Sequence, residues 1–186
     1  SYGGSRREAI ELACKTQRPL IATIELEKIS LVENLHSALE PLLEVHADIV
    51  VPHRRSLASY PPMQQWAECS GNEFFARLTA RRLDMWFGAR CMLRQHADYF
   101  LAYKTLPYCK KWGAYYPDKW DAMFVPVIDA IIEGKQIISV DTDYMHPTQQ
   151  TRIEHDDPAM NRKRIDQLEL LVKVMNEHWN KRIRAI

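Results

Sequence analysis

The sequence lacks the features that mark several large classes of protein. No apolar run approaches the ~20 residues of a membrane-spanning helix, so no membrane span is expected. Lysine and arginine total 25 and aspartate and glutamate total 24, and this balance argues against a general nucleic-acid binder. The four cysteines lie far apart without a Cys-x-x-Cys pair, which argues against a zinc site or a disulfide framework and indicates reduced thiols in a cytoplasmic protein.

Motifs of well-known catalytic sites are missing as well. The sequence contains no Gly-x-Ser-x-Gly, P-loop or His-Glu-x-x-His motif. No signal peptide is visible in a sequence that begins at Ser1. What the chain does have is 46% hydrophobic residues over 186 positions, enough to bury the core of one domain spanning 1–186.

Apolar and β-branched patterns predict an α/β domain. A strand, a helix and a second strand in succession are typical of parallel pairing, so we expect a mostly parallel sheet flanked by helices. The predicted strands are 20–24, 47–51 and 137–140, and the predicted helices are 5–15, 30–43, 63–78, 123–133 and 160–179.

Two carboxylates directly follow the first predicted strand. Glu25 and Glu27 point the same way on an extended chain, so they are candidates for holding a divalent cation and a phosphate group. The alternative is a solvent-exposed strand end with Lys28 as salt-bridge partner. Arg54, after the second strand, and Arg7, in the first turn of the first helix, are candidates for phosphate contact, with plain solvent exposure as the alternative for Arg7.

The third predicted strand ends in a second acidic group. Asp141, Asp143 and His146 follow it, and a histidine with carboxylates suits Mn²⁺ or a similar metal ion. The alternative is a turn in which Asp143 bonds backbone N–H groups and His146 is merely exposed. Asp121, after Trp120, begins an apolar helix, where it either complements the helix dipole or acts as a general base in a cleft.

Taken in order, these motifs resemble the second half of a GT-A glycosyltransferase of the broad family-2 type. The resemblance covers roughly residues 3–147. It is carried by Glu25-Leu26-Glu27 in the place of an acidic metal-binding motif, the strand from Ala47 to Val51 with Pro52 and Arg54, the junction Phe87-Gly88-Ala89-Arg90, Trp120-Asp121 at a helix start, and Ile137 to His146.

The resemblance implies a fold, a reaction and a set of residue roles. The fold would be an α/β GT-A domain. The activity would be transfer of a sugar from a nucleotide-diphosphate donor to a hydroxyl acceptor, with Mn²⁺ or Mg²⁺ as cofactor. The implied roles are general base for Asp121, metal binding for Glu25, Glu27 and His146, donor-phosphate binding for Arg7, Arg54 and Asp143, and acceptor binding for Trp120, Gly88 and Arg90.

Three departures from the family pattern keep other functions open. Glu-x-Glu replaces Asp-x-Asp, Trp120 stands where an acidic partner of the catalytic Asp is usual, and the N-terminal nucleotide-binding βαβ half is missing from the sequence. We therefore expect a fragment, or a chain that receives that half from elsewhere, for instance in an oligomer, or a copy without turnover. The alternatives are a non-catalytic module that binds carbohydrate or protein, and a metal-dependent hydrolase built on Asp141, Asp143 and His146.

Overall fold

The computed structural model describes residues 2–44, 47–104 and 119–185, which form an α/β domain. No helix within these ranges is both long and apolar enough to cross a membrane. The strands are β1 (Leu20–Thr23), β2 (Ile49–Arg54), β3 (Arg90–Leu93) and β4 (Ile137–Thr142). The helices are α1 (Tyr2–Lys15), α2 (Leu35–Glu44), α3 (Pro62–Thr79), α4 (Asp98–Leu101), α5 (Asp121–Ile132), α6 (Thr148–Glu154) and α7 (Pro158–Ile183), with short 3-10 helices η1 (Leu26–Asn34), η2 (Met85–Phe87) and η3 (Arg94–His96).

Most of the predicted elements are confirmed, with boundaries that shift by a few residues. The predicted helix 30–43 differs, because its first half is the 3-10 helix η1 and only its second half is α-helical, as α2. The predicted terminal helix is longer than expected: α7 begins after Asp157, whose side chain accepts a hydrogen bond from the Ala159 backbone N–H at 2.8 Å. The sequence pattern does not predict β3.

The sheet is mixed, and the prediction of a mostly parallel sheet is wrong. Its strand order is β1-β3-β2-β4. β3 is antiparallel to both β1 and β2, and only β2 and β4 form a parallel pair. The first two predicted strands do not pair, because β3 lies between them, with Leu93 opposite Leu20 and Met92 opposite Ile49. β1, β2 and β4 nevertheless run in the same direction, so their carboxyl ends lie along one edge of the sheet.

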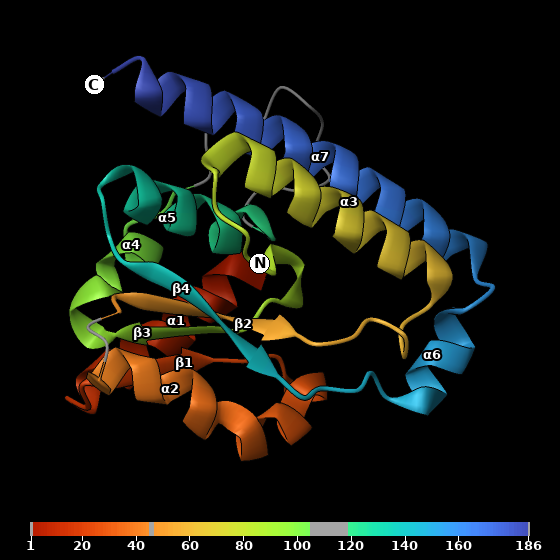
Figure 1. Ribbon diagram of the computed structural model, residues 1–186, viewed down its shortest axis with the longest axis horizontal. Helices are drawn as coiled ribbons and strands as arrows, with labels where there is room; N and C mark the ends of the chain where they lie inside the picture. The colour runs from red at the N-terminus through yellow and green to blue at the C-terminus, as the bar shows by residue number, and fades with distance from the viewer. Residues whose placement is uncertain (1, 45–46, 105–118, 186) are drawn as a thin grey trace.

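Helices cover both faces of this sheet, as Figure 1 shows, with α2 on one side and α3, α5 and α7 on the other. Successive residues of β2 point to opposite faces, as a strand requires. Ile49 and Val51 enter the main core with Val127 of α5, whereas Val50 packs against Leu42 of α2. The two longest helices, α3 and α7, lie side by side. Their ends near α6 flank the edge at which β2 and β4 finish.

Candidate functional site

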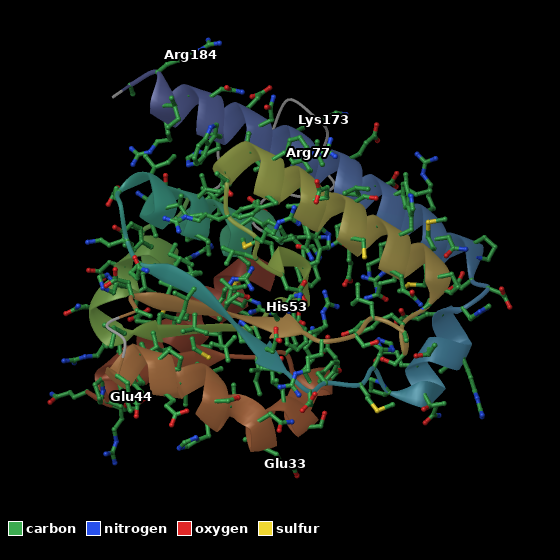
Figure 2. The ribbon with its side chains drawn as sticks, in the orientation of Figure 1. Glu33, Glu44, His53, Arg77, Lys173 and Arg184 are labelled. Atoms are coloured by element: carbon green, nitrogen blue, oxygen red, sulfur yellow. The ribbon has the colours of Figure 1, made fainter. Side chains whose placement is uncertain are left out.

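A small polar cavity lies where the carboxyl ends of the three codirectional strands meet helices α3 and α7. Its volume is about 120 Å³, enough for several waters or one small polar group. It lies beyond the end of β2, which His53 marks in Figure 2. Five residues singled out in the sequence line this cavity, namely Glu25, Glu27, Arg54, Trp120 and His146. The structure therefore brings together residues that are more than 100 positions apart in the chain.

Glu25 is held in the wall of the cavity by two cations. Its carboxylate forms an ion pair with Arg6 at 3.0 Å and a second, direct one with Lys28. Gly88 lies directly against the Glu25 carboxylate. Its backbone has a φ of 84°, a left-handed conformation that favours glycine. A Cβ at Gly88 would lie 3.0 Å from a carboxylate oxygen of Glu25. The glycine, predicted to bind an acceptor, thus has a structural reason to be there.

Lys28 lies between the two predicted metal-binding carboxylates. Its ammonium contacts Glu25, lies 4.0 Å from Oε1 of Glu27 and sits 5.6 Å from the centre of the Phe87 ring. Burial, reinforced by nearby Arg54, lowers the pKa of Lys28 below the usual lysine value. The resulting pKa is about 7, with the charge of Glu68 acting in the opposite sense and favouring the charged form.

The two carboxylates predicted to bind metal face cations as they are arranged, and the metal role of His146 stays a prediction. Both oxygens of Glu25 face cations, and the ammonium of Lys28 contacts Glu25 and lies 4.0 Å from Glu27. His146 bonds the hydroxyl of Thr151 through Nδ1 at 2.8 Å, which does not exclude metal binding through its other ring nitrogen, Nε2. Across the described ranges, no group of three or more His, Cys, Asp or Glu side chains is placed to hold a metal ion.

Arg54 lies beneath the cavity, in a buried ion network. Its guanidinium donates to Asp84 through Nε and Nη2, both at 2.7 Å, and to Glu68 through Nη1 at 2.6 Å. The guanidinium carbon lies 4.9 Å from the centre of the Tyr60 ring and 5.0 Å from that of Phe87. Arg54 was predicted to hold a donor phosphate, but these contacts engage all three of its nitrogens.

Helices α3 and α7 supply cavity residues that the sequence analysis missed. Gln64 and Glu68 lie one turn apart on α3, and Gln64 donates to Glu68 at 2.7 Å. Arg164 of α7 donates to Gln64 at 2.9 Å and pairs with Glu154 of α6 at 3.2 Å. Lys163, the neighbour of Arg164, also lines the cavity. The only local signal is polar residues at helical spacing, which in a sequence looks like an ordinary solvated face.

Two buried tyrosines place hydroxyl donors in the wall of the cavity. Tyr60 and Tyr144 are 3% and 7% exposed and line the cavity. Neither hydroxyl has a hydrogen-bond partner within the described part of the chain. Burial raises the pKa of both phenols, so both remain protonated and able to donate. Because buried polar groups are almost always paired, these two hydroxyls require water or a ligand in the cavity.

His146 is a neutral member of the same wall. Its ring packs against Tyr60, with centroids 4.4 Å apart, and its backbone N–H donates to the hydroxyl of Ser59 at 2.9 Å. Burial lowers the pKa of His146 against the opposing effect of Glu154. The alternative in which this histidine is merely exposed is therefore wrong, since only 6% of its surface is accessible.

Asp121 begins α5 as expected, but it does not line the cavity. Its side chain is buried, accepts the Lys119 backbone N–H at 2.8 Å and accepts a hydrogen bond from the hydroxyl of Tyr103. Trp120, the residue before it, does reach the cavity. The role of Asp121 as general base stays a prediction.

The remaining predicted site residues lie elsewhere. Arg90 is fully buried and donates to the carbonyls of Ala89 and Met85, at 2.6 and 2.9 Å. Asp143 is exposed and pairs with Arg55 at 3.0 Å. Arg7 is not among the cavity-lining residues, whereas its neighbour Arg6 reaches Glu25.

The second acidic group of the sequence does not form a cluster. Asp141 pairs with His53 at 2.8 Å on the exposed end of the sheet, and Asp143 turns to Arg55. Of the three residues, only His146 enters the cavity. A hydrolase site built on all three has no support in this geometry.

A larger hollow, of about 710 Å³, lies between α4, α5 and α7. Several of its charged groups are paired with one another: Asp129 bonds His178 at 2.8 Å and Arg182 at 3.0 Å, and Glu133 accepts from Tyr99 at 2.6 Å. It contains none of the residues singled out in the sequence. The smaller cavity, with its unpaired buried hydroxyls, is therefore the candidate functional site.

Comparison of the chain with protein-family models, with curated proteins and with solved structures gives no match.

Proposed function

We propose that this chain is the catalytic or acceptor half of a GT-A-type glycosyltransferase, and that the small cavity receives one polar part of a nucleotide sugar, namely its diphosphate with the adjoining edge of the sugar. One observation carries the proposal. The segments that follow β1 and β4 bring Glu25, Glu27 and His146 to a single polar cavity, which the last residue of β2, Arg54, and Trp120 also line. Ligand sites of open α/β sheets form outside the carboxyl ends of strands, where this cavity lies.

The lining of the cavity suits a sugar and its phosphates. Glu27 offers acceptor oxygens to sugar hydroxyls, Tyr60 and Tyr144 offer unpaired donors, and Trp120 offers an aromatic face. In the proposed reaction, an acceptor hydroxyl oxygen forms a bond to the anomeric carbon of the donor. The bond from that carbon to the diphosphate breaks, its electron pair leaves with the diphosphate, and the acceptor proton passes to a general base.

Glu27→Gln is expected to weaken nucleotide-sugar binding. The side chain of Glu27 is half exposed at the cavity and has only one distant ion-pair partner within the described ranges, Lys28 at 4.0 Å. Loss of a hydrogen bond to a charged group costs ~1.5–3 kcal/mol, which corresponds to about a ten- to hundredfold increase in Kd. Binding of a panel of uridine and guanosine diphosphate sugars would be measured by calorimetry, and turnover by release of the nucleoside diphosphate.

Glu33→Gln provides the matched control for this experiment. Glu33 lies on the same 3-10 helix, η1, but is exposed, does not line the cavity and lies at the outside of the molecule in Figure 2. This variant is expected to bind like the wild type. Absence of binding for every nucleotide sugar, or equal effects of the two substitutions, would contradict the proposal.

The second candidate is a non-catalytic module that binds carbohydrate in the same cavity. The contacts of Asp121 favour it, because its carboxylate bonds Tyr103 and the Lys119 backbone and does not line the cavity. A general base has to reach the proton that it removes. Sugar-nucleotide binding without release of nucleoside diphosphate, unchanged in Asp121→Asn, would select this candidate over catalysis.

A further inference from the structure

We propose that Lys28 is a built-in cation that replaces a divalent metal ion, so that the cavity binds its anionic ligand without metal. The identity of that ligand, the diphosphate of a nucleotide sugar, rests on the proposed function. The exclusion of metal does not rest on the proposed function, since it depends only on the contacts of Lys28. Nothing in the family resemblance predicts this, because the resemblance implies Mn²⁺ or Mg²⁺.

The first argument is the position of the Lys28 ammonium. It contacts Glu25, lies 4.0 Å from Glu27 and is held over the ring of Phe87, with only 11% of the side chain exposed. A metal ion bridging two carboxylates would occupy the same space, with ligand bonds of ~2–2.6 Å. The ammonium therefore has to leave before such an ion could bind.

The second argument is electrostatic. Arg6 adds another positive charge at 3.0 Å from Glu25, so the two carboxylates already face two cations. A divalent ion ~4 Å from one unit positive charge loses roughly thirtyfold in affinity even at the dielectric constant of water, and more in a buried site. The pair Glu25 and Glu27 is consequently a poor metal site while Lys28 remains in place.

The third argument is that several groups of the cavity are donors without acceptors. Lys163 of α7 lines it and has no ion-pair partner within the described ranges. The hydroxyls of Tyr60 and Tyr144 are buried there without acceptors in the described part of the chain. Ammonium and hydroxyl donors without acceptors suit an oxygen-rich anion, which would accept from all of them. An anion bound beside Lys28 would favour its protonated form, which would offset the charge on the departing diphosphate.

The decisive experiment titrates the protein with Mn²⁺ alone and measures free Mn²⁺ by electron paramagnetic resonance. Wild-type protein is expected to show no saturable binding at this site. Lys28→Met removes the charge, keeps the length of the side chain and should tighten Mn²⁺ binding by roughly thirtyfold or more. Lys163→Met is the matched control, because it also removes a cavity lysine but not the one between the carboxylates, and it should create no site.

A gain of Mn²⁺ binding in Lys28→Met that disappears in Lys28→Met/Glu27→Gln would support the proposal. Saturable Mn²⁺ binding by wild-type protein that is lost in Glu27→Gln would overturn it, as would a Lys28→Met variant that folds and gains nothing. Lys28→Gln serves if the methionine variant does not fold. If neither variant folds, the wild-type titration and Glu27→Gln decide alone.

A second arm uses uridine diphosphate as the probe in the presence and absence of EDTA. Equal affinities in the two buffers are expected, with a loss in Lys28→Met. Binding that requires added Mn²⁺ would overturn the proposal. Absence of any binding would instead count against the proposed function, since the Mn²⁺ titration is independent of the ligand.

Discussion

Arg54→Met is expected to lower the free energy of unfolding by about 3–5 kcal/mol, the usual cost of removing one partner of a buried ion pair. Asp84 and Glu68 would be left buried and charged, at 3% exposure each. The guanidinium now gives them three hydrogen bonds of 2.6–2.7 Å. Urea unfolding followed by circular dichroism would measure the loss.

Arg55→Met is the matched control for this prediction. Arg55 is the next residue in the chain and pairs with Asp143 at 3.0 Å, but both side chains are more than half exposed. Exposed pairs contribute ~0–1 kcal/mol, so this variant should be nearly as stable as the wild type. Equal losses in Arg54→Met and Arg55→Met would contradict a stabilising role for the buried network.

The pH dependence of Arg54→Met provides a separate check. Burial alone would raise the pKa of Asp84, but the facing Arg54 holds it below its usual value. The ion pair therefore stabilises the fold at pH values above the unfolded-state pKa of Asp84, about 4. This stabilisation is lost as the pH falls toward the lower pKa that Asp84 has in the folded state. In Arg54→Met, burial without the countercharge raises that pKa, and protonation relieves the buried charge. The difference from wild type should shrink from about pH 7 to about pH 5.

The sequence predicts the strands that contain an apolar run, but not the sheet that they form. β1, β2 and β4 are identifiable because they are short β-branched runs between turn signals. β3 is four residues long and begins with the charged Arg90. The guanidinium of Arg90 can be buried because backbone carbonyls accept hydrogen bonds from it. Sheet order depends on pairings such as Leu20 with Leu93, which no local pattern encodes.

The candidate site could be predicted only where it consists of strand ends. Glu25, Glu27 and His146 follow apolar strands, and residues in that position converge when strands run in one direction. Glu68 and Lys163 come from helices whose polar residues look like solvated faces in the sequence. The role of Arg54 depends on Glu68 and Asp84, 14 and 30 positions away, so its engagement in ion pairs is not visible before the chain is folded.

A second large effect is expected at the contact between α3 and the wall of the cavity. Gly71 lies within α3, and a Cβ there would lie 2.2–2.5 Å from three atoms of the Trp86 indole. Exchange of glycine for alanine inside a helix ordinarily stabilises by ~0.5–1 kcal/mol. Here the sign is expected to reverse, and Gly71→Ala should destabilise by about 3 kcal/mol, the upper end of the cost of overpacking.

The cost depends on whether Trp86 can move. Its ring packs edge-on against Phe124, with centroids 4.7 Å apart, and it also lines the cavity. Trp86→Phe removes much of the indole ring that meets the new methyl group. Gly71→Ala should therefore cost ~0.5–3 kcal/mol less in the Trp86→Phe background, a difference that a double-mutant cycle in urea would measure.

Gly134→Ala separates steric overlap from backbone strain. Gly134 has φ of +75°, and a Cβ there would meet no described atom within 4 Å, so alanine should cost only the ~1–2 kcal/mol of a left-handed conformation. Trp86→Phe should not change that cost. If Trp86→Phe reduced the cost of both alanine substitutions equally, the reduction at Gly71 would be a general effect of Trp86→Phe on stability. Relief confined to Gly71 would mean that this glycine sets the position of Trp86, and thereby the shape of the cavity wall.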